Sequence, residues 1–196
     1  MSINLAVFAS GAGSNAEKII DYFNHHQSKK NIRVTLIVCN KPGAGVLNIA
    51  GNNNIPSVLI EKERFFRGDG YVPVLKAAKI EVVILAGFLW KVPTALVHAY
   101  NGKILNIHPA LLPKYGGKGM YGNFVHEAVI AAGDAESGIT IHVVDEQYDH
   151  GHHIFQAFCP VLPGDTPASL AARIHTLEHA NYPRVIEEFI NHEIED

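Results

Sequence analysis

A short apolar run ends at Asn106, His108 and Pro109, and the side chains of the asparagine and the histidine are suited to acyl-type chemistry. An asparagine and a histidine two positions apart on a strand point the same way, and a proline, which has no N–H, ends the strand beyond them. Ligands of open α/β sheets bind just outside the carboxyl ends of the strands. An amide that donates to a developing oxyanion beside a titratable imidazole suits acyl or formyl transfer. Taken alone, the same residues fit an ordinary turn at least as well.

A glycine-rich turn at residues 10–15 (SGAGSN) follows the first apolar run. Glycines permit a tight turn, and the N–H groups at the start of the next helix offer an anion site. A dinucleotide site also needs an acidic residue about 20 positions further on, but the second strand ends at residues 39–41 (CNK). We therefore predict that the turn binds a phosphate monoester and not NAD. The alternative is that Ser14 caps the helix together with Glu17.

The polar stretch 145–153 (DEQYDHGHH) connects two later apolar runs and is the second candidate for chemistry. We expect its acids to lie near His108. A carboxylate near an imidazole raises the pKa of the ring and fixes its tautomer, which suits proton transfer near neutral pH. The histidines at 150, 152 and 153 invite a metal site, but adjacent histidines do not easily bind one ion. We therefore predict no metal and exposed loop histidines.

Apolar runs alternate with helical patterns along the chain, which predicts βαβ units and an α/β fold. We expect an open, mostly parallel twisted sheet with helices on both faces, a Rossmann-like arrangement. The run 82–86 is apolar throughout, as a central strand must be. The runs 139–144 and 154–159 predict an antiparallel addition in the C-terminal half. Strands are expected at residues 3–9, 34–39, 58–60, 82–86, 104–107, 139–144 and 154–159.

Two helices are predicted from periodicity and capping residues. Apolar residues at 16, 19, 20 and 23 repeat at helical spacing, and a later helix opens with Thr166 as its cap and Pro167 as its first residue. Positions 170, 174 and 177 form the buried stripe of that later helix. His175 and Glu178 share a face beside the stripe, either as a site for a substrate amine or as a surface pair. Pro183 begins or kinks a last helix that extends to residue 190.

Composition narrows the class of protein. The 196 residues, 47% of them hydrophobic, predict one globular domain over residues 1–196. Sixteen basic against nineteen acidic residues leave no basic field for nucleic acid, so any phosphate must be held locally. Cys39 and Cys159 lack CxxC spacing and fit a reducing compartment. No leader pattern or membrane-length apolar run is present. We expect a soluble cytoplasmic protein that binds neither nucleic acid nor a membrane.

Over essentially its whole length the chain resembles the phosphoribosylglycinamide formyltransferases, folate-dependent enzymes of purine synthesis. The motif Asn-x-His-Pro with a distal Asp is shared by the wider formyltransferase superfamily and indicates the reaction class. The SGxGSN turn is more specific, because it looks like a ribose-phosphate clamp. The matching segments are SGAGSN at 10–15, LAGF at 85–88, LNIHP at 105–109, LLPKY at 111–115, IHV at 141–143 with Asp149, and EHA at 178–180 before YP at 182–183.

The resemblance implies a formyltransferase fold in which residues 1–100 bind the nucleotide and residues 101–196 carry the catalytic and folate-binding parts. The implied reaction moves the formyl group of 10-formyltetrahydrofolate to the amine of glycinamide ribonucleotide by direct attack. Asn106 would polarise the formyl group. His108 would stabilise the tetrahedral intermediate as an imidazolium and donate a proton, with Asp149 raising its pKa.

The resemblance also implies two groups of binding residues, with the two small molecules as the expected partners and no metal. The ribonucleotide would be bound by Gly13, Ser14, Asn15, His175 and Glu178. The folate would be bound, largely through backbone groups, by Leu89, Trp90, Lys91, Val92, Asn106, Asp145, Glu146, Gln147, Tyr148 and Asp149. Arg64 and Arg67 are both candidates for holding the folate tail, because Trp90 stands near a position that is basic in many relatives.

The resemblance also implies a cis peptide before Pro113. The glycine-rich loop 116–123 is longer than in many relatives, and we expect it to act as a mobile lid over the nucleotide. A homodimer is a further expectation. The competing interpretations are another 10-formyltetrahydrofolate-dependent formyltransferase or hydrolase, and a non-catalytic domain that binds a nucleotide phosphate.

Overall fold

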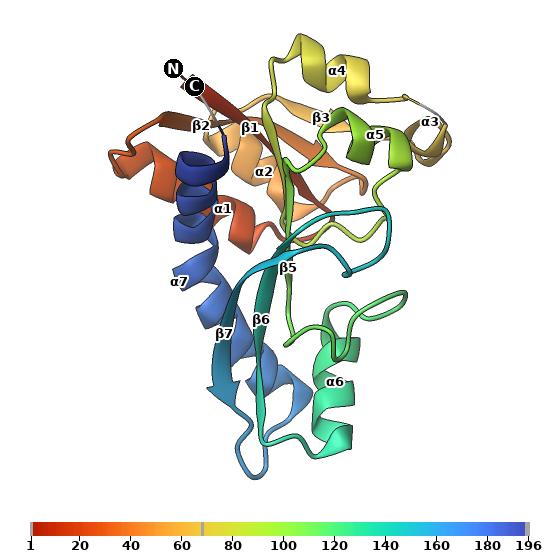
Figure 1. The fold of residues 1–196 in the computed structure, drawn as a ribbon, viewed down its shortest axis with the longest axis vertical. Helices are drawn as coiled ribbons and strands as arrows, with labels where there is room; N and C mark the ends of the chain where they lie inside the picture. Colours follow the sequence, from red (N-terminus) through yellow and green to blue (C-terminus); the bar gives the residue numbers. More distant parts are fainter. Residues whose placement is uncertain (1, 68, 195–196) are drawn as a thin grey trace.

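Seven strands form one mixed sheet in the computed structural model, which describes residues 2–67 and 69–194 (Figure 1). The strand order is β3-β2-β1-β4-β5-β6-β7. Strands β1 to β5 pair in parallel, and β6 and β7 add antiparallel. The strands are β1 (Ser2–Ala9), β2 (Asn31–Cys39), β3 (Ser57–Leu59), β4 (Val82–Leu85), β5 (Ile104–His108), β6 (Glu136–Val143) and β7 (His153–Pro160). The helices are α1 (Ser14–His25), α2 (Gly45–Asn52), α3 (Lys62–Phe66), α4 (Val72–Ala77), α5 (Thr94–Ala99), α6 (Asn123–Ala132) and α7 (Pro167–Glu193).

The predicted fold class is confirmed, because each of the seven apolar runs overlaps one observed strand. The central run becomes β4, in which every residue is buried. Two strands, β2 and β6, begin three residues earlier than expected. β2 begins at Asn31 and not at Val34, because the backbone of its polar first residues pairs with the start of β1 although Asn31 and Arg33 have exposed side chains.

Side chains that alternate along the strands build two cores, one on each face of the sheet. Leu5 and Val7 of β1 pack on one face with residues of α1, α2, α6 and α7. Ala6 and Phe8 pack on the other face with residues of α3, α4 and α5. Figure 1 shows α1 and α7 on one side of β5 and α4 and α5 on the other.

The same alternation gives β5 a polar side at the carboxyl end of the sheet. Its residues at 105 and 107 belong to the core beneath α7, so Asn106 and His108 point to the opposite face. Strand β6 pairs with β5 so that Asn106 lies opposite His142 and His108 lies opposite Thr140. Two neighbouring strands therefore present four polar side chains on one face, next to the ends of the parallel strands.

Helix α7 differs from the expectation in its second half. Its predicted cap is confirmed, because the Thr166 side chain accepts a hydrogen bond from the Ser169 N–H at 3.2 Å. Pro183 lies inside one continuous helix, so the expectation of a separate last helix there is wrong. Buried side chains on both sides of Pro183, including Tyr182 and Val185, stabilise the helix where the proline removes an N–H donor. No helix in the described part of the chain is long and apolar enough to cross a membrane.

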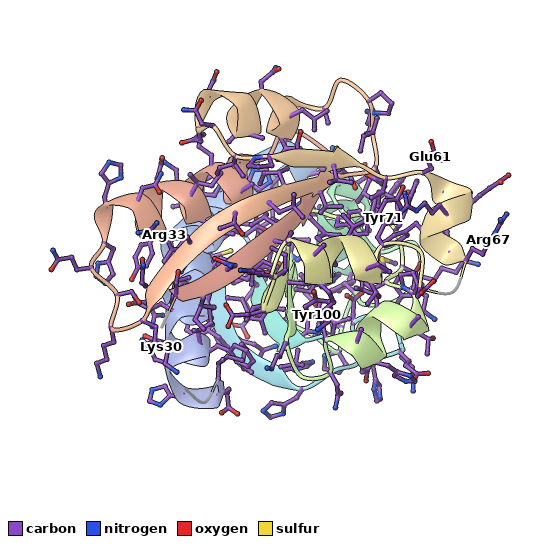
Figure 2. All side chains as sticks on the ribbon, turned by 90° about the horizontal axis from the view of Figure 1, so that it is seen from above. Lys30, Arg33, Glu61, Arg67, Tyr71 and Tyr100 are labelled. Carbon is purple, nitrogen blue, oxygen red and sulfur yellow. The ribbon has the colours of Figure 1, made fainter. Side chains whose placement is uncertain are left out.

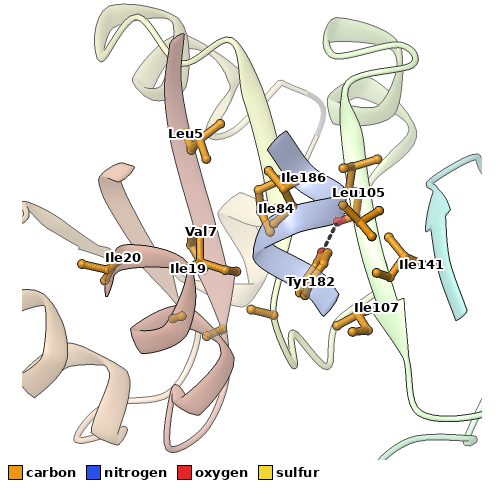
Figure 3. Close-up of a cluster of buried hydrophobic side chains, with 14 of the residues drawn as sticks. Leu5, Val7, Ile19, Ile20, Ile84, Leu105, Ile107, Ile141, Tyr182 and Ile186 are labelled. Atoms are coloured by element: carbon orange, nitrogen blue, oxygen red, sulfur yellow. Dashed lines mark hydrogen bonds between the residues drawn. The ribbon is translucent and has the colours of Figure 1, made fainter. Parts of the chain in front are cut away.

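Tyr182 connects α7 to two central strands. Its fully buried hydroxyl lies 2.9 Å from the carbonyl oxygen of Leu85, at the end of β4, and 3.2 Å from that of Leu105 in β5. Figure 3 shows the ring among the apolar side chains of these strands. This contact places α7 against the strand that carries Asn106.

We expect Tyr182→Phe to lower the free energy of unfolding by about 1–2 kcal/mol, because it removes the donor to buried carbonyl groups and leaves the ring packing intact. Urea denaturation followed by circular dichroism measures the change. Tyr121→Phe is the matched control, since Tyr121 is exposed and should change stability by less than about 0.5 kcal/mol. Equal stability of the two variants would contradict the assigned role of the hydroxyl.

Candidate active site

A cavity of about 630 Å³ opens at the carboxyl ends of the parallel strands, within the usual size of small-molecule sites. Its wall is formed by the first βα turn, the turn after β4, the end of β5, the loop 117–122, the β6–β7 connection and one face of α7. Ser10 connects two of these segments, because its hydroxyl accepts a hydrogen bond from the Leu89 N–H at 2.9 Å. Most of the predicted site residues lie on this wall: Gly13, Ser14, Asn15, Leu89, Trp90, Lys91, Val92, Asn106, His108, Asp145, Gln147, Tyr148, Asp149, His175 and Glu178.

Glu146 is the exception among the predicted site residues. Its carboxylate pairs with the exposed His98 at 2.7 Å, so the side chain has a surface role. The neighbouring His150 pairs with Asp145 at 2.9 Å and is also exposed, as expected for a loop histidine. No group of three or more metal-binding side chains occurs in residues 2–67 and 69–194.

The two arginines proposed for the folate tail have other partners. Arg64 donates to the Gly70 carbonyl at 3.0 Å and lies over the Tyr71 ring at 4.4 Å. Arg67 forms an exposed pair with Glu63 at 3.8 Å and extends into solvent (Figure 2). Both arginine side chains therefore lie outside the cavity wall, Arg64 because it is held by its partners and Arg67 because it extends into solvent.

The first βα turn has the geometry of an anion site. Gly13 adopts a φ of 86°, and a Cβ there would lie 2.8 Å from the Cβ of Val46, so glycine is required by both conformation and space. Within the described residues, α1 begins at Ser14 with no side-chain cap, so the alternative in which Ser14 caps the helix is wrong. The first N–H groups of α1 therefore remain available to a ligand at the positive end of the helix dipole.

Asn15 connects the anion site to α7. Its amide donates to the Glu178 carboxylate at 2.9 Å, while its own oxygen is buried without a hydrogen-bond partner among the described residues. Burial raises the pKa of Glu178, against the opposing effects of the Asn15 hydrogen bond and of His175. A buried carboxylate and an unpaired acceptor on a cavity wall suit a ligand that brings N–H or O–H donors.

His126 of α6 also lies on the cavity wall, although no pattern in the sequence indicates it. The side chain is buried, and its Nδ1 has no partner in the part of the chain that the structure describes. Burial lowers its pKa to about 4, with further contributions from His175 and His108. The ring is therefore neutral near pH 7.

His108 and Asp149 lie together, as expected. The Nε2 of His108 donates to the Tyr115 carbonyl at 2.7 Å, and its Nδ1 lies 3.6 Å from the Asp149 carboxylate. Asp149 in turn accepts a hydrogen bond from the Gly117 N–H at 2.9 Å. A protonated His108 ring would therefore have an acceptor facing each of its nitrogens.

Asp149 raises the pKa of His108, as expected, but this effect does not decide the net shift. Burial lowers the pKa of His108, and this outweighs the raising effects of Asp149 and the Tyr115 carbonyl. Burial also raises the pKa of Asp149, but contacts with His142, His108 and the Gly117 N–H together hold it below its usual range. Asp149 is thus an anion at neutral pH, and His108 is charged less readily than a free histidine.

Four supporting groups around His108 had no predicted role. Thr140 donates to the Ala110 carbonyl at 2.7 Å and accepts from the Leu112 N–H at 3.0 Å, which holds the segment after β5. The expected cis peptide between Leu112 and Pro113 is confirmed. A pattern in the sequence does indicate the two β6 residues, Thr140 and His142, because positions 140 and 142 are polar at a spacing of two in an otherwise apolar run. The supporting groups are the side chains of Thr140 and His142, the carbonyl of Tyr115 and the N–H of Gly117.

Comparison with known proteins agrees with this geometry. The family model described as formyl transferase matches residues 3–186. The chain belongs to the formyl transferase family. It is 44% identical over 190 residues to the chloroplastic phosphoribosylglycinamide formyltransferase of Vigna unguiculata, covering 93% of this chain and 59% of that relative.

Two further relatives differ in how much of their own length this chain matches. The trifunctional purine biosynthetic protein adenosine-3 of Drosophila melanogaster is 38% identical over 191 residues, which cover 95% of this chain and 14% of that relative. The crystal structure of phosphoribosylglycinamide formyltransferase from Bacillus halodurans superimposes with a TM-score of 0.86 at 34% identity, covering 96% of each chain. The chain thus spans about three fifths of the Vigna relative and nearly all of the bacterial structure.

We expect Asp149→Asn to lower the pKa of His108 further, because the variant removes the negative charge that favours the imidazolium and leaves the burial unchanged. Nitrogen-15 NMR titration of the histidine rings measures the shift. Asp145→Asn is the control, since the Asp145 carboxylate contacts His150. A His108 pKa that rises or stays constant in Asp149→Asn would contradict the assigned electrostatics.

Proposed function

We propose that this chain transfers the formyl group of 10-formyltetrahydrofolate to the amine of glycinamide ribonucleotide, a step of purine synthesis. The observation that carries the proposal is that an anion site, a buried carboxylate and the group Asn106, His108 and Asp149 share one cavity. A domain that only binds a nucleotide has no need of all of them. The names of the Vigna, Drosophila and Bacillus relatives support the same reaction.

The ribonucleotide is assigned to the end of the cavity between α1 and α7. Its phosphate would accept hydrogen bonds from the backbone of Gly13, Ser14 and Asn15. Its amine would lie by Glu178, and His175 lies on the same wall. The phosphate and the amine are thereby assigned to two different elements, which fixes the direction of the molecule in the cavity.

The folate is assigned to the part of the cavity lined by residues 89–92, 144, 145 and 147–149. A pterin presents amide-like donors and acceptors at its edge, so backbone groups of these two segments are suitable partners. Trp90 packs on the rings of Phe65 and Phe88 at 5.7 and 6.3 Å, which makes this wall apolar beside the polar edge. The Lys91 ammonium lies 5.7 Å from the Tyr148 ring and brings a positive charge to this wall.

The proposed chemistry is direct transfer without a covalent enzyme intermediate. The substrate amine attacks the formyl carbon, a new C–N bond forms, and the bond from that carbon to N10 breaks as the tetrahedral intermediate collapses. The amine loses one proton and N10 gains one, so the reaction is balanced in protons. Asn106 would donate to the oxygen on which negative charge develops.

We assign to His108 the transfer of the proton and part of the stabilisation of the developing negative charge. Its Nε2–H is held by the Tyr115 carbonyl, so Nδ1 is the nitrogen that exchanges a proton. Because burial lowers the pKa of this ring, the negative charge of the developing oxyanion and of Asp149 must favour its charged form during the reaction.

We also propose a reducing compartment, the cytoplasm. Both cysteines, Cys39 and Cys159, are buried as free thiols. The Vigna relative is named as chloroplastic, so location differs within the family.

We expect purified protein to formylate glycinamide ribonucleotide with 10-formyltetrahydrofolate, and His108→Ala to lower kcat by about 100-fold or more because charge stabilisation is lost. Product is measured by the absorbance of released tetrahydrofolate and by mass spectrometry. His25→Ala is the control, since His25 is an exposed residue at the end of α1.

The products separate the competing interpretations. Formate released without an acceptor amine would indicate a hydrolase, and transfer only to a different amine would indicate another formyltransferase. Binding of the ribonucleotide without any turnover would indicate a binding domain. Full turnover of His108→Ala would leave the substrates correct and the mechanism wrong.

We expect Glu178→Gln to raise KM for the ribonucleotide by about tenfold, with a smaller effect on KM for the folate, because it removes the charge that faces the amine. Steady-state kinetics with each substrate varied in turn measures both constants. Glu188→Gln is the matched control, since Glu188 forms a surface pair with Arg184 on the same helix. An equal rise in both KM values would contradict the assigned direction of the ribonucleotide.

A further inference from the structure

His142 contacts both side chains that flank the proposed reaction centre. Its Nε2 lies 3.1 Å from the Asn106 amide nitrogen and 3.7 Å from the Asp149 carboxylate. Its Nδ1 lies 3.0 Å from the carbonyl oxygen of Val143. The side chain is 2% exposed, so these contacts are made away from bulk water.

The partners of His142 determine which of its nitrogens carries the proton. A carbonyl oxygen only accepts, so the Nδ1 that faces Val143 is the protonated nitrogen. In the neutral ring Nε2 is then unprotonated, and it accepts a hydrogen bond from the Asn106 amide at 3.1 Å. Both contacts are satisfied by one form of the ring, the neutral tautomer with the proton on Nδ1.

We propose that His142 is a positioning residue that fixes the orientation of the Asn106 amide, an inference that rests on the proposed function. An asparagine side chain presents either its NH₂ group or its oxygen to a given neighbour, and the two orientations have nearly the same shape. With Nε2 as an acceptor, His142 holds the NH₂ group on its own side. The second hydrogen of that group is then available to the oxygen of the formyl group.

The opposite orientation would oppose catalysis. If Asn106 turned its oxygen toward the reaction centre, an acceptor would face the developing oxyanion, and the transition state would lose a donor. An apolar residue in place of His142 leaves both orientations accessible and leaves a buried N–H without a partner. The effect therefore falls on the reaction step more than on substrate binding.

Protonation of His142 reverses the arrangement. A hydrogen on Nε2 would face the donor of Asn106, so the amide would rotate or the new N–H would pair with Asp149. Rotation of the amide removes the donor to the formyl oxygen, and pairing of the new N–H with Asp149 draws that carboxylate away from His108. The titratable and charged groups around His142 are His108 on β5, His153 on β7 with its ring 6.3 Å away, and Asp145 and Asp149 in the β6–β7 connection.

Two variants test this assignment. His142→Leu removes the acceptor, and we expect kcat for formyl transfer to fall about 10- to 100-fold while both KM values change less than about threefold. His142→Gln restores an acceptor oxygen near the position of Nε2, so we expect kcat within about threefold of wild type.

A spectroscopic measurement tests the same assignment without turnover. Nitrogen-15 NMR of the wild-type protein at neutral pH should show Nδ1 of His142 protonated and Nε2 unprotonated. A ring with its proton on Nε2, or a doubly protonated ring, would overturn the inference whatever the substrate proves to be. Absence of formyl transfer by wild type would overturn the proposed function and leave this result to decide the state of His142.

The remaining outcomes are decisive when kcat is expressed per folded molecule, with thermal unfolding used to measure the folded fraction. Loss in His142→Leu with recovery in His142→Gln supports the positioning role. Wild-type kcat in His142→Leu overturns it. Equal losses in both variants also overturn it, because they would show that packing and not the acceptor is what matters.

Discussion

Burial of hydrogen-bonding side chains between β5 and β6 is the constraint on which the rest of the site depends. His108, Thr140 and His142 are each at most 3% exposed, so each of their polar atoms needs a partner inside the protein. Those partners come from the segment after β5 and from the β6–β7 connection. The two loops that enclose the cavity are therefore held by the same contacts that orient the reactive groups.

The electrostatics of the site follow from the same burial. His108 and Asp149 have a low-dielectric surrounding, which penalises both charges, and the charges favour each other only across 3.6 Å. For Asp149 the hydrogen bonds and neighbouring rings outweigh burial, whereas for His108 burial prevails. The free protein thus holds the Asp149 anion beside a mostly neutral His108 ring. Additional negative charge near the ring would favour its charged form.

Much of the fold and part of the site were accessible from the sequence. Alternation of apolar runs and helical patterns predicts the sheet, because burial of strands and helix faces determines residue types directly. Asn106 and His108 were placed together by strand geometry, and Asp149 by its position between two strands. The features that the sequence did not predict depend on tertiary structure: the uncapped start of α1, the pairing of Glu146 with His98, the uninterrupted α7 and the burial that lowers the pKa of His108. Spacing along the chain contains none of these distances.

The hydroxyl of Tyr182 has a consequence beyond stability. Tyr182 lies one helical turn after Glu178 on α7, and its hydroxyl contacts the carbonyl of Leu85, at the end of β4, and that of Leu105, the residue before Asn106 on β5. One buried side chain thus joins the helix assigned to the amine to the strand assigned to the formyl group. The distance between the two proposed substrate positions therefore depends on a contact within the core and not on the loops around the cavity, and group transfer between two bound molecules is sensitive to that distance.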